Sequence, residues 1–501
     1  MHRTQPSRAW PSIDQIWVVA LVTLIALKVQ LTPIMPNDFW WHIATGRIIA
    51  QTGDIPRADQ FSYLRDGQAY YNQPWLAQLL MYGGYELGGP ALLVFLQTLL
   101  ITGSFALLYT ICRREGADVR VAVMSTLVGA LVAMDNWQIR PQTYAIPLCI
   151  ATLGILLAWR RSGRAPLWAL PLIMLLWVNL HGTFTLLPVL CGIFWLGAIA
   201  ERQWFTQSVS SPRSWQELRA LALWSAAALL ATLANPRGFG IWGYVAGLLS
   251  NRSVGDLVTE WASPFRVINE PMTWIFFGVF AIMVAILAWR RRYVHLTDLL
   301  VLLPFTALSF QSVRNILWFG IVAAPICARL LSAEARPARR PIGVVFMNRL
   351  IAGLLALMVL GTLPWWKEAL DLPPAVGNLI SVETPVAATE ELRARGLQPQ
   401  RLFHEMGFGS YLIWSTPDRR VFIDPRIELY PYEQWRDYIV LGQGQEVDAL
   451  AEKYDFDGWL IDAERQAGLV ATLDRHPAWQ RVFTAEQTVY FAPRLNAGRS
   501  K

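Results

Sequence analysis

The strongest constraint on this chain is a series of apolar runs, each about as long as a bilayer is thick. A helix needs about 20 apolar residues to cross roughly 30 Å of hydrocarbon. Runs of this kind centre near residues 24, 100, 127, 150, 173, 192, 226, 280, 303, 322 and 355. They predict a polytopic α-helical membrane protein with about eleven transmembrane helices. Residues 239–249 are a candidate for one more.

The composition agrees with this class. The 501 residues are 54% hydrophobic and 16% charged, whereas a soluble domain carries roughly 25% charged residues. The net charge of +7 does not indicate nucleic acid as a partner, because excess Lys and Arg in a membrane protein usually lies in cytoplasmic loops. The first apolar run, residues 13–34, is longer than the apolar part of a signal peptide and lacks a clear cleavage site. We expect it to be an uncleaved first span.

Alternate connections between the apolar runs are rich in arginine, which predicts the orientation. By the positive-inside rule these connections are cytoplasmic, and so is the amino terminus. An odd number of spans then places the carboxy-terminal region outside. The arginines concerned are Arg3, Arg8, Arg113, Arg114, Arg120, Arg160, Arg161, Arg164, Arg202, Arg213, Arg219, Arg290, Arg291, Arg292, Arg336, Arg339, Arg340 and Arg349.

Two domains are expected. Residues 1–368 form the transmembrane domain, with a long first outer loop at residues 35–89. This loop holds an amphipathic stretch at 39–51 and a second helix that opens at Asn72-Gln73-Pro74-Trp75, and both can lie at the membrane interface with tryptophans at headgroup depth. Residues 369–501 alternate short apolar runs (401–404, 421–424, 459–462, 488–491) with helical patterns. This pattern predicts a small extracytoplasmic α/β domain.

The run Pro36-Asn37-Asp38-Phe39-Trp40-Trp41-His42 follows the first span and contains the main catalytic candidate. Asp38 and His42 are four residues apart, so they share one face if a helix begins here. The tryptophans provide a partly desolvated setting in which the proton affinity of a carboxylate can be tuned. An aspartate at such a place is more often a helix cap. Asn72 and Gln73 are further candidates for substrate contacts in the same loop.

Three arginines in separate outer loops indicate the substrate class. Arg140, Arg237 and Arg314 all lie next to span ends, where a cation is costly unless it is paired. A guanidinium binds phosphate through paired hydrogen bonds. Each arginine alone is equally consistent with a helix cap or a lipid-headgroup anchor. Together they favour a shared anionic ligand, namely a phosphate or pyrophosphate on a lipid whose tail stays among the membrane lipids.

Other polar residues of the outer loops complete the candidate substrate site: Gln142, Asn179, His181 and Glu260. Polar residues that interrupt apolar stretches are expensive and often functional. His181 is suited to a substrate hydroxyl, a phosphate or a metal, and equally to an interhelical hydrogen bond. Glu260-Trp261 suits a sugar, and also an ordinary loop. Asp38, His42 and His181 are possible metal ligands but are dispersed in the sequence, so neither a metal nor any other cofactor is predicted.

These features together resemble the GT-C class of membrane glycosyltransferases, which includes protein O-mannosyltransferases, aminoarabinose transferases and oligosaccharyltransferases. The resemblance rests on the first span followed by a large outer loop that opens with an acidic residue and holds two interfacial helices. The run from Asn37 to Gly46, the element Arg140-Pro141-Gln142 and the outer α/β tail are also similar to a set of bacterial membrane proteins. Many GT-C members have two adjacent acidic residues, whereas Asn37 precedes Asp38 here.

The resemblance implies a function. Asp38 would be the general base that activates an acceptor, while Arg140, Arg237 or Arg314 would stabilise the departing phosphate of a polyprenyl-phosphate-linked sugar. The transfer would invert the anomeric centre. The acceptor would be an extracytoplasmic glycan, lipid or protein, and the enzyme would lie in the bacterial cytoplasmic membrane. Two alternatives stay open: a transporter or flippase for a lipid-linked anion, and a non-catalytic protein of envelope assembly.

Overall fold

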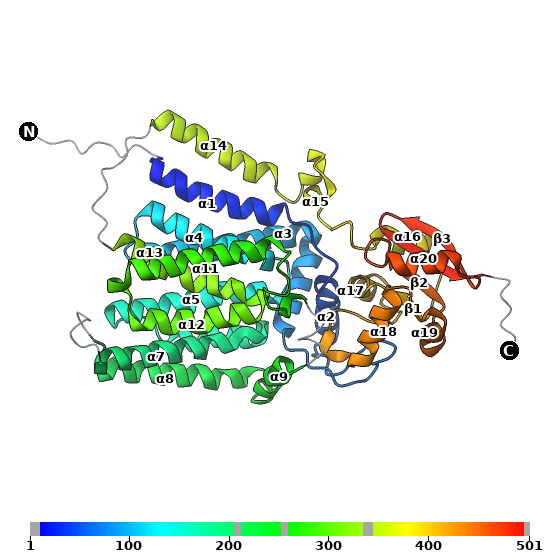
Figure 1. Cartoon of the computed structure of the whole chain (residues 1–501), viewed down its shortest axis with the longest axis horizontal. Helices are drawn as coiled ribbons and strands as arrows, with labels where there is room; N and C mark the ends of the chain where they lie inside the picture. Colours follow the sequence, from blue (N-terminus) through cyan, green and yellow to red (C-terminus); the bar gives the residue numbers. More distant parts are fainter. Residues whose placement is uncertain (1–10, 205–211, 252–258, 334–343, 495–501) are drawn as a thin grey trace, which may run out of the picture. The chain divides into compact units, whose positions relative to one another are not determined.

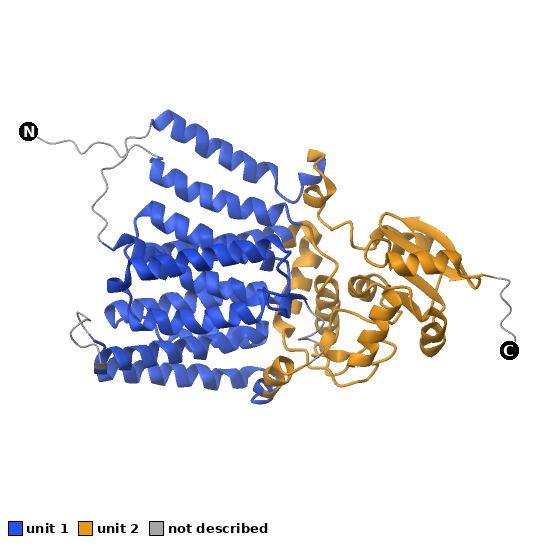
Figure 2. Ribbon diagram, viewed as in Figure 1, with its two compact units in different colours: residues 1–32, 94–242, 259–369 blue, residues 33–93, 243–258, 370–501 orange. Residues whose placement is uncertain are grey.

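The computed structural model describes residues 11–204, 212–251, 259–333 and 344–494. The chain divides into two compact units, coloured separately in Figure 2. Unit 1 comprises Met1–Thr32, Val94–Trp242 and Thr259–Ala369, and unit 2 comprises Pro33–Leu93, Gly243–Val258 and Leu370–Lys501. The first outer loop and the carboxy-terminal region therefore belong to one unit. Each unit is described separately.

Unit 1 is a bundle of apolar helices that run side by side (Figure 1). Its helices are α1 (Ile13–Gln30), the later part of α3 (Trp75–Arg114), α4 (Val119–Ala133), α5 (Pro141–Ser162), α6 (Ala169–Leu180), α7 (Leu186–Trp204), α8 (Trp215–Ala231), α11 (Pro271–Trp289), α12 (Leu296–Gln311), α13 (Ile316–Ser332) and α14 (Val345–Gly361). Short 3-10 turns at Met134–Asn136, Gly182–Thr185, Thr232–Ala234 and Arg291–Tyr293 adjoin them. Helix α9 (Gly240–Leu249) crosses the division between the units.

All eleven predicted span centres fall within helices, and residues 239–249 form α9. Among the described residues, eight helices are long and apolar enough to cross a membrane. Four apolar helices, α6, α9, α12 and α14, are shorter. The chain is thus a multi-pass membrane protein, as its apolar runs predicted.

Helices α4 and α13 cross closely at a pair of glycines. A Cβ atom on Gly129 would lie 2.8 Å from the carbonyl oxygen of Gly320, and a Cβ on Gly320 would lie 2.8 Å from that of Gly129. Small residues allow helix backbones to approach in this way, which increases van der Waals contact inside a membrane. Helix α1 packs against α14, α6 against α8, and α12 against α7.

The arginine-rich connections meet at one end of unit 1. Arg160 at the end of α5 donates to Asp298 of α12 at 2.5 Å and to Glu115 at 3.3 Å. Arg329 of α13 pairs with the same Asp298 carboxylate. Ion pairs therefore join α5, α12 and α13 at this end of the bundle. Arg3, Arg8, Arg336, Arg339 and Arg340 lie outside the residues that the structure describes.

Unit 2 contains a four-stranded sheet in the order β1-β2-β4-β3. Strand β1 (Leu402–His404) is parallel to β2 (Gly458–Asp462), and β4 (Thr488–Pro493) pairs antiparallel with both β2 and β3 (Trp479–Ala485). The helices are α2 (Phe39–Thr52), the start of α3, α15 (Pro374–Gly377), α16 (Val386–Ala394), α17 (Met406–Ser415), α18 (Tyr432–Gly442), α19 (Val447–Tyr454) and α20 (Ala467–Arg475). The expected small α/β architecture is present.

The strand expected at residues 421–424 does not form, and β3 was not expected. The backbone of the buried segment 421–424 bonds to other groups in place of a ladder. Phe422 N donates to the His404 ring at 3.1 Å, and the Gln434 side chain donates to Phe422 O at 2.9 Å. Val421 exchanges backbone hydrogen bonds with Phe61 and Tyr63 of the first outer loop. Loop and side-chain partners thus satisfy the polar groups that a neighbouring strand would otherwise satisfy.

Candidate functional site

Arg140 is placed by the residue that follows it. Pro141 occupies the first turn of α5 and disfavours helical backbone at the residue before it, and Arg140 is extended (φ −157°, ψ 164°). Its side chain donates two hydrogen bonds to Glu260, at 2.7 and 3.0 Å, and one to Asn136 Oδ1 at 3.3 Å. The Arg140 side chain is only 7% exposed. A charge-assisted pair of this kind offsets the cost of bringing a cation out of water.

Arg314 reaches the same cluster from the 3-10 turn Val313–Asn315. It donates to Gln142 Oε1 at 3.1 Å, and its guanidinium lies 4.7 Å from the centroid of the Trp261 ring. The turn Thr259–Trp261, which carries Glu260, is fixed to this region by the Ser312 hydroxyl, which donates to Glu260 O at 2.7 Å. Two arginines from separate predicted outer loops are therefore brought together around one glutamate.

The electrostatics of this cluster keep it positively charged. Burial would raise the pKa of the Glu260 carboxyl, but Arg140 and Arg314 lower that pKa below its usual range. Burial, with Arg314 and Arg140 adding to it, lowers the pKa of His181 well below its usual range. At neutral pH the cluster therefore holds two guanidinium cations, one carboxylate and one neutral imidazole. The remaining positive charge favours an anion.

His181 lies between α6 and the turn Gly182–Thr185 with an extended backbone (φ −162°, ψ 147°). Its Nδ1 accepts from Thr183 N at 3.2 Å and lies 2.9 Å from the Thr183 hydroxyl. This local capping contact agrees with the structural alternative for His181. Arg314 and Arg140 are close enough to His181 to lower its pKa.

Asn179 and Arg237 belong to a neighbouring hydrogen-bonded turn. Asn235 Nδ2 donates to Val178 O at 3.2 Å and to Asn179 Oδ1 at 3.3 Å, and Arg237 N donates to Asn235 Oδ1 at 3.1 Å. Arg237 is exposed on this turn. The contacts found here give Asn179 a structural role and group Arg237 with Asn235.

Asp38, His42, Asn72 and Gln73 belong to unit 2. Asp38 directly precedes α2, and its carboxylate does not cap that helix. The side chain is half-buried. The commonest structural role of an aspartate at this place, a side-chain helix cap, is therefore not the role of Asp38.

His42 and Asn72 are joined through Gln78, which sequence reasoning missed. Asn72 Nδ2 donates to Gln78 Oε1 at 2.7 Å, and Gln78 Nε2 donates to His42 Nδ1 at 3.0 Å. This chain of bonds leaves Nε2 of a neutral His42 ring as the N–H donor. Gln73, which follows Asn72 in the sequence, is also buried. The polar residues of the first outer loop thus form a network rather than isolated contacts.

Helix α2 is held against α17. Trp41 N donates to the Ser410 hydroxyl at 3.0 Å. Trp40 is 1% exposed and Trp41 is 5% exposed, so both rings contact protein on nearly all sides. Trp40 packs edge-on to Tyr411 with ring centroids 4.9 Å apart. The tryptophans therefore belong to the core of unit 2.

The start of α17 lies next to the residue before Asp38. Glu405 caps α17 by accepting from Phe408 N at 3.1 Å. A Cβ atom on Gly407 would lie 2.9 Å from Glu405 Oε2 and 3.3 Å from Asn37 Oδ1. A buried carboxyl, Glu405, is thus part of the packing that positions the Asn37-Asp38 backbone.

Asp424-Pro425-Arg426 forms a buried ion-pair network. Arg426 donates to Asp424 at 2.8 and 2.6 Å and pairs with Asp59 of the first outer loop at 2.6 Å. Its guanidinium also lies 5.1 Å from the Tyr70 ring centroid. This network joins the first outer loop to the carboxy-terminal residues within unit 2, which is a structural role.

Three residues of these networks were not predicted as site residues: Asn136, Gln78 and Glu405. Asn136 stands four residues before Arg140 in the same polar run, so that spacing could have identified it. Gln78 and Glu405 carry no comparable local signal, because the contact of Gln78 with His42 and the approach of the α17 start to Asn37 join separate segments of the chain. Among the described residues, no group of three or more His, Cys, Asp or Glu side chains is placed to hold a metal ion.

No protein-family model and no curated protein sequence matches the chain. Solved structures do match. The archaeal oligosaccharyltransferase AglB from Archaeoglobus fulgidus, in complex with an inhibitory peptide and a dolichol-phosphate, has a TM-score of 0.55 at 13% identity, and the match covers 96% of this chain and 74% of that one. The arabinofuranosyltransferase AftD from Mycobacteria has a TM-score of 0.53 at 14% identity, and the match covers 96% of this chain and 40% of AftD.

At these identities the similarity establishes the fold. The predicted GT-C-like architecture, a polytopic helical membrane domain with a small carboxy-terminal sheet domain, is confirmed.

The buried pair His404 and Glu405 generates a pH prediction. Burial raises the pKa of Glu405 from 4.5 to about 7 and lowers the pKa of His404 from 6.5 to about 4. The Glu405 contribution to stability is lost as pH rises through 4.5 to 7, whereas the His404 contribution is lost as pH falls through 6.5 to 4. Each shift corresponds to roughly 3 kcal/mol at most. The two effects oppose each other in the wild type.

Glu405→Gln removes only the first effect. We expect the stability of this variant relative to the wild type to increase between pH 4.5 and 7.5, measured as the unfolding midpoint of the purified full chain in detergent. The exposed Glu452→Gln serves as the control and should show no such trend. A difference in unfolding midpoint between Glu405→Gln and wild type that does not change with pH would contradict the prediction that Glu405 is protonated in the folded protein.

Proposed function

We propose that this protein is a membrane glycosyltransferase that moves a sugar from a polyprenyl-phosphate-linked donor to an extracytoplasmic acceptor. The observation that carries the proposal is the cluster of Arg140, Glu260, Gln142 and Arg314 at the end of an apolar bundle. The GT-C-like fold supports it, as does the dolichol-phosphate bound to AglB. The acceptor is a glycan, a lipid or a protein.

The proposed role of Arg140 and Arg314 is to hold the donor phosphate. Both are anchored, Arg140 by Glu260 and Asn136 and Arg314 by Gln142 and Trp261. Preorganised cations of this kind stabilise charge that develops on a leaving group without reorganising at that moment. Arg237 is a further candidate for contact with the same phosphate, or with lipid headgroups.

Buried or half-buried polar side chains are proposed to bind the sugar hydroxyls. A neutral His181 can donate one hydrogen bond through Nε2, because Nδ1 accepts from Thr183 N. His42, Asn72 and Gln73 of unit 2 are the corresponding candidates in the first outer loop. These contacts orient a substrate and are not required for proton transfer.

Asp38 is the proposed general base. Its carboxylate is not used as a helix cap, and it is half-buried in an aromatic setting. A base within hydrogen-bond reach of an acceptor hydroxyl or amine would remove its proton as the bond to the sugar forms. Attack on the side opposite the phosphate would invert the anomeric centre.

The proposed location is the bacterial cytoplasmic membrane, with the Arg140 end of unit 1 outside. The arginines gathered at the opposite end, near the Arg160–Asp298–Arg329 cluster, support a cytoplasmic location for that end under the positive-inside rule. A reporter enzyme that is active only after export should be active when it is fused after Lys367. Absence of activity from that fusion would contradict this orientation.

Substitutions at Asp38 and Arg140 test the function. Asp38→Asn should reduce sugar transfer by about 10²- to 10⁴-fold because the base is lost. Arg140→Gln should reduce it by about 10²- to 10³-fold because a charge that stabilises the leaving phosphate is lost. The measurement is transfer of a radiolabelled sugar from polyprenyl phosphate by the purified full chain, with size-exclusion profiles to verify folding.

Arg164→Gln is the matched control, because Arg164 is exposed in an arginine-rich connection at the opposite end of the bundle. It should transfer at the wild-type rate. Normal transfer by a folded Asp38→Asn protein would overturn the role of Asp38. Loss of lipid translocation with Arg140→Gln but not with Asp38→Asn would instead favour a transporter.

A further inference from the structure

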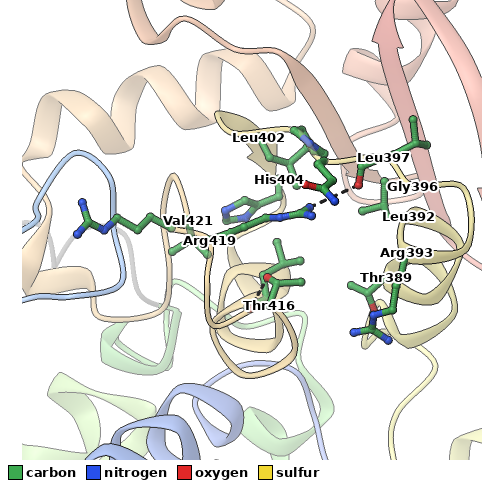
Figure 3. Close-up of a pocket in the computed structure, with 14 residues that line it drawn as sticks. Thr389, Leu392, Arg393, Gly396, Leu397, Leu402, His404, Thr416, Arg419 and Val421 are labelled. Carbon is green, nitrogen blue, oxygen red and sulfur yellow. Dashed lines mark hydrogen bonds between the residues drawn. The ribbon is translucent and has the colours of Figure 1, made fainter.

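A cavity of about 110 Å³ opens in the carboxy-terminal part of unit 2. Its walls come from α16, the turn after α16, β1 and the end of α17 (Figure 3). By volume it can hold roughly seven to ten water-sized groups. None of the residues assigned to the proposed transferase function lines it.

Aliphatic side chains form a continuous part of the cavity wall. Leu392, Leu402, Leu412 and Val421 line it and are also members of the buried hydrophobic core of the unit. No Phe, Tyr or Trp side chain is among the lining residues, and the ring of His404, which is bonded on both sides to backbone groups, is the one aromatic group there. A flat sugar face, which commonly stacks on an aromatic ring, is therefore a poorer match than a branched aliphatic group of similar volume.

Arg419 supplies the cation of this cavity. Figure 3 shows its side chain extended across the cavity toward Leu397, and its one side-chain hydrogen bond, to Leu397 O, is long at 3.5 Å. Within the part of the chain that the structure describes, Arg419 forms no ion pair with a carboxylate. A guanidinium in this state has most of its five N–H groups available to a ligand.

The other two arginines near the cavity are engaged elsewhere. Arg420 pairs with Asp66 at 2.8 Å. Arg393 is exposed, turns away from the cavity in Figure 3, and donates to Ser415 O at 3.4 Å. A single cation therefore faces a space partly lined by aliphatic side chains, which suits a ligand with one negative charge.

Two threonines add hydrogen-bond acceptors. The Thr416 hydroxyl donates to Leu412 O at 2.7 Å, and the Thr389 hydroxyl donates to Val386 O at 2.8 Å. Since each hydroxyl has used its proton, each can only accept a further hydrogen bond. The ligand should therefore carry an N–H or O–H donor in addition to its carboxylate.

We propose that this cavity binds an aliphatic carboxylate that bears a nearby N–H donor, with the carboxylate on Arg419 and the aliphatic group among the leucines. Two kinds of ligand carry these groups: a free amino acid and the carboxy-terminal residue of a peptide. A bidentate guanidinium–carboxylate contact provides both affinity and orientation. Recognition of a chain terminus by its carboxylate is a common mode of peptide binding.

The test is calorimetric titration of the purified full chain with three probes. N-acetyl-L-leucine keeps the carboxylate and the amide N–H, N-acetyl-L-leucinamide lacks the carboxylate, and L-leucine has a free ammonium group. We expect N-acetyl-L-leucine or L-leucine to bind saturably and the amide to bind at least about tenfold more weakly. Tighter binding of N-acetyl-L-leucine assigns a peptide terminus, and tighter binding of L-leucine assigns a free amino acid.

Two variants examine the contacts. Arg419→Gln should weaken the binding of the preferred probe at least about tenfold, and Thr416→Val should weaken it to a smaller extent while keeping the shape of the wall. Arg393→Gln is the matched control and should bind as the wild type does. The proposal is overturned if neither carboxylate binds to the wild type, if the amide binds equally well, or if a folded Arg419→Gln protein binds unchanged.

Discussion

Paired arginines at the ends of an apolar bundle are the interactions on which unit 1 depends. A cation beside hydrocarbon is tolerated only when a partner compensates for lost hydration. At one end Asp298 receives both Arg160 and Arg329. At the other end Glu260 receives Arg140, and Arg314 lies beside Gln142 and Trp261. The first cluster also contains Glu115, so its arginines share two carboxylates, whereas the second has the single carboxylate Glu260 for two arginines. This difference separates a structural cluster from a candidate ligand site.

Unit 2 depends on a different principle, in which segments distant in the sequence satisfy one another's polar groups. The first outer loop has no sheet of its own. It is fixed by Arg426, which pairs with Asp59, and by Ser410, which accepts from the backbone of Trp41. Because α2 is packed in this way, the position of Asp38 is set by the carboxy-terminal residues as much as by its own loop. A functional residue in a loop is thereby held on a rigid scaffold.

The sequence predicted the helices of unit 1 well, because each needs a long apolar run that few other structures require. It also predicted that Arg140 and Arg314 would lie close together, because both belong to polar loops next to span ends on the same predicted side of the membrane. It could not predict that the Val421 segment would bond to a side chain and a loop in place of a strand. Nor could it predict that Glu405 would support the start of α17. Those outcomes depend on contacts between separate segments, some of them hundreds of positions apart, such as Val421 with Phe61, which local patterns do not encode.

The central claim is that Arg140 and Arg314 form a phosphate site. The most direct test is an experimental density map of the full chain purified with a polyprenyl phosphate. The claim predicts phosphate density within hydrogen-bond distance of both guanidinium groups, with the Glu260 carboxylate still adjacent to Arg140. A well-resolved lipid phosphate bound at another place, with this cluster unoccupied, would contradict it.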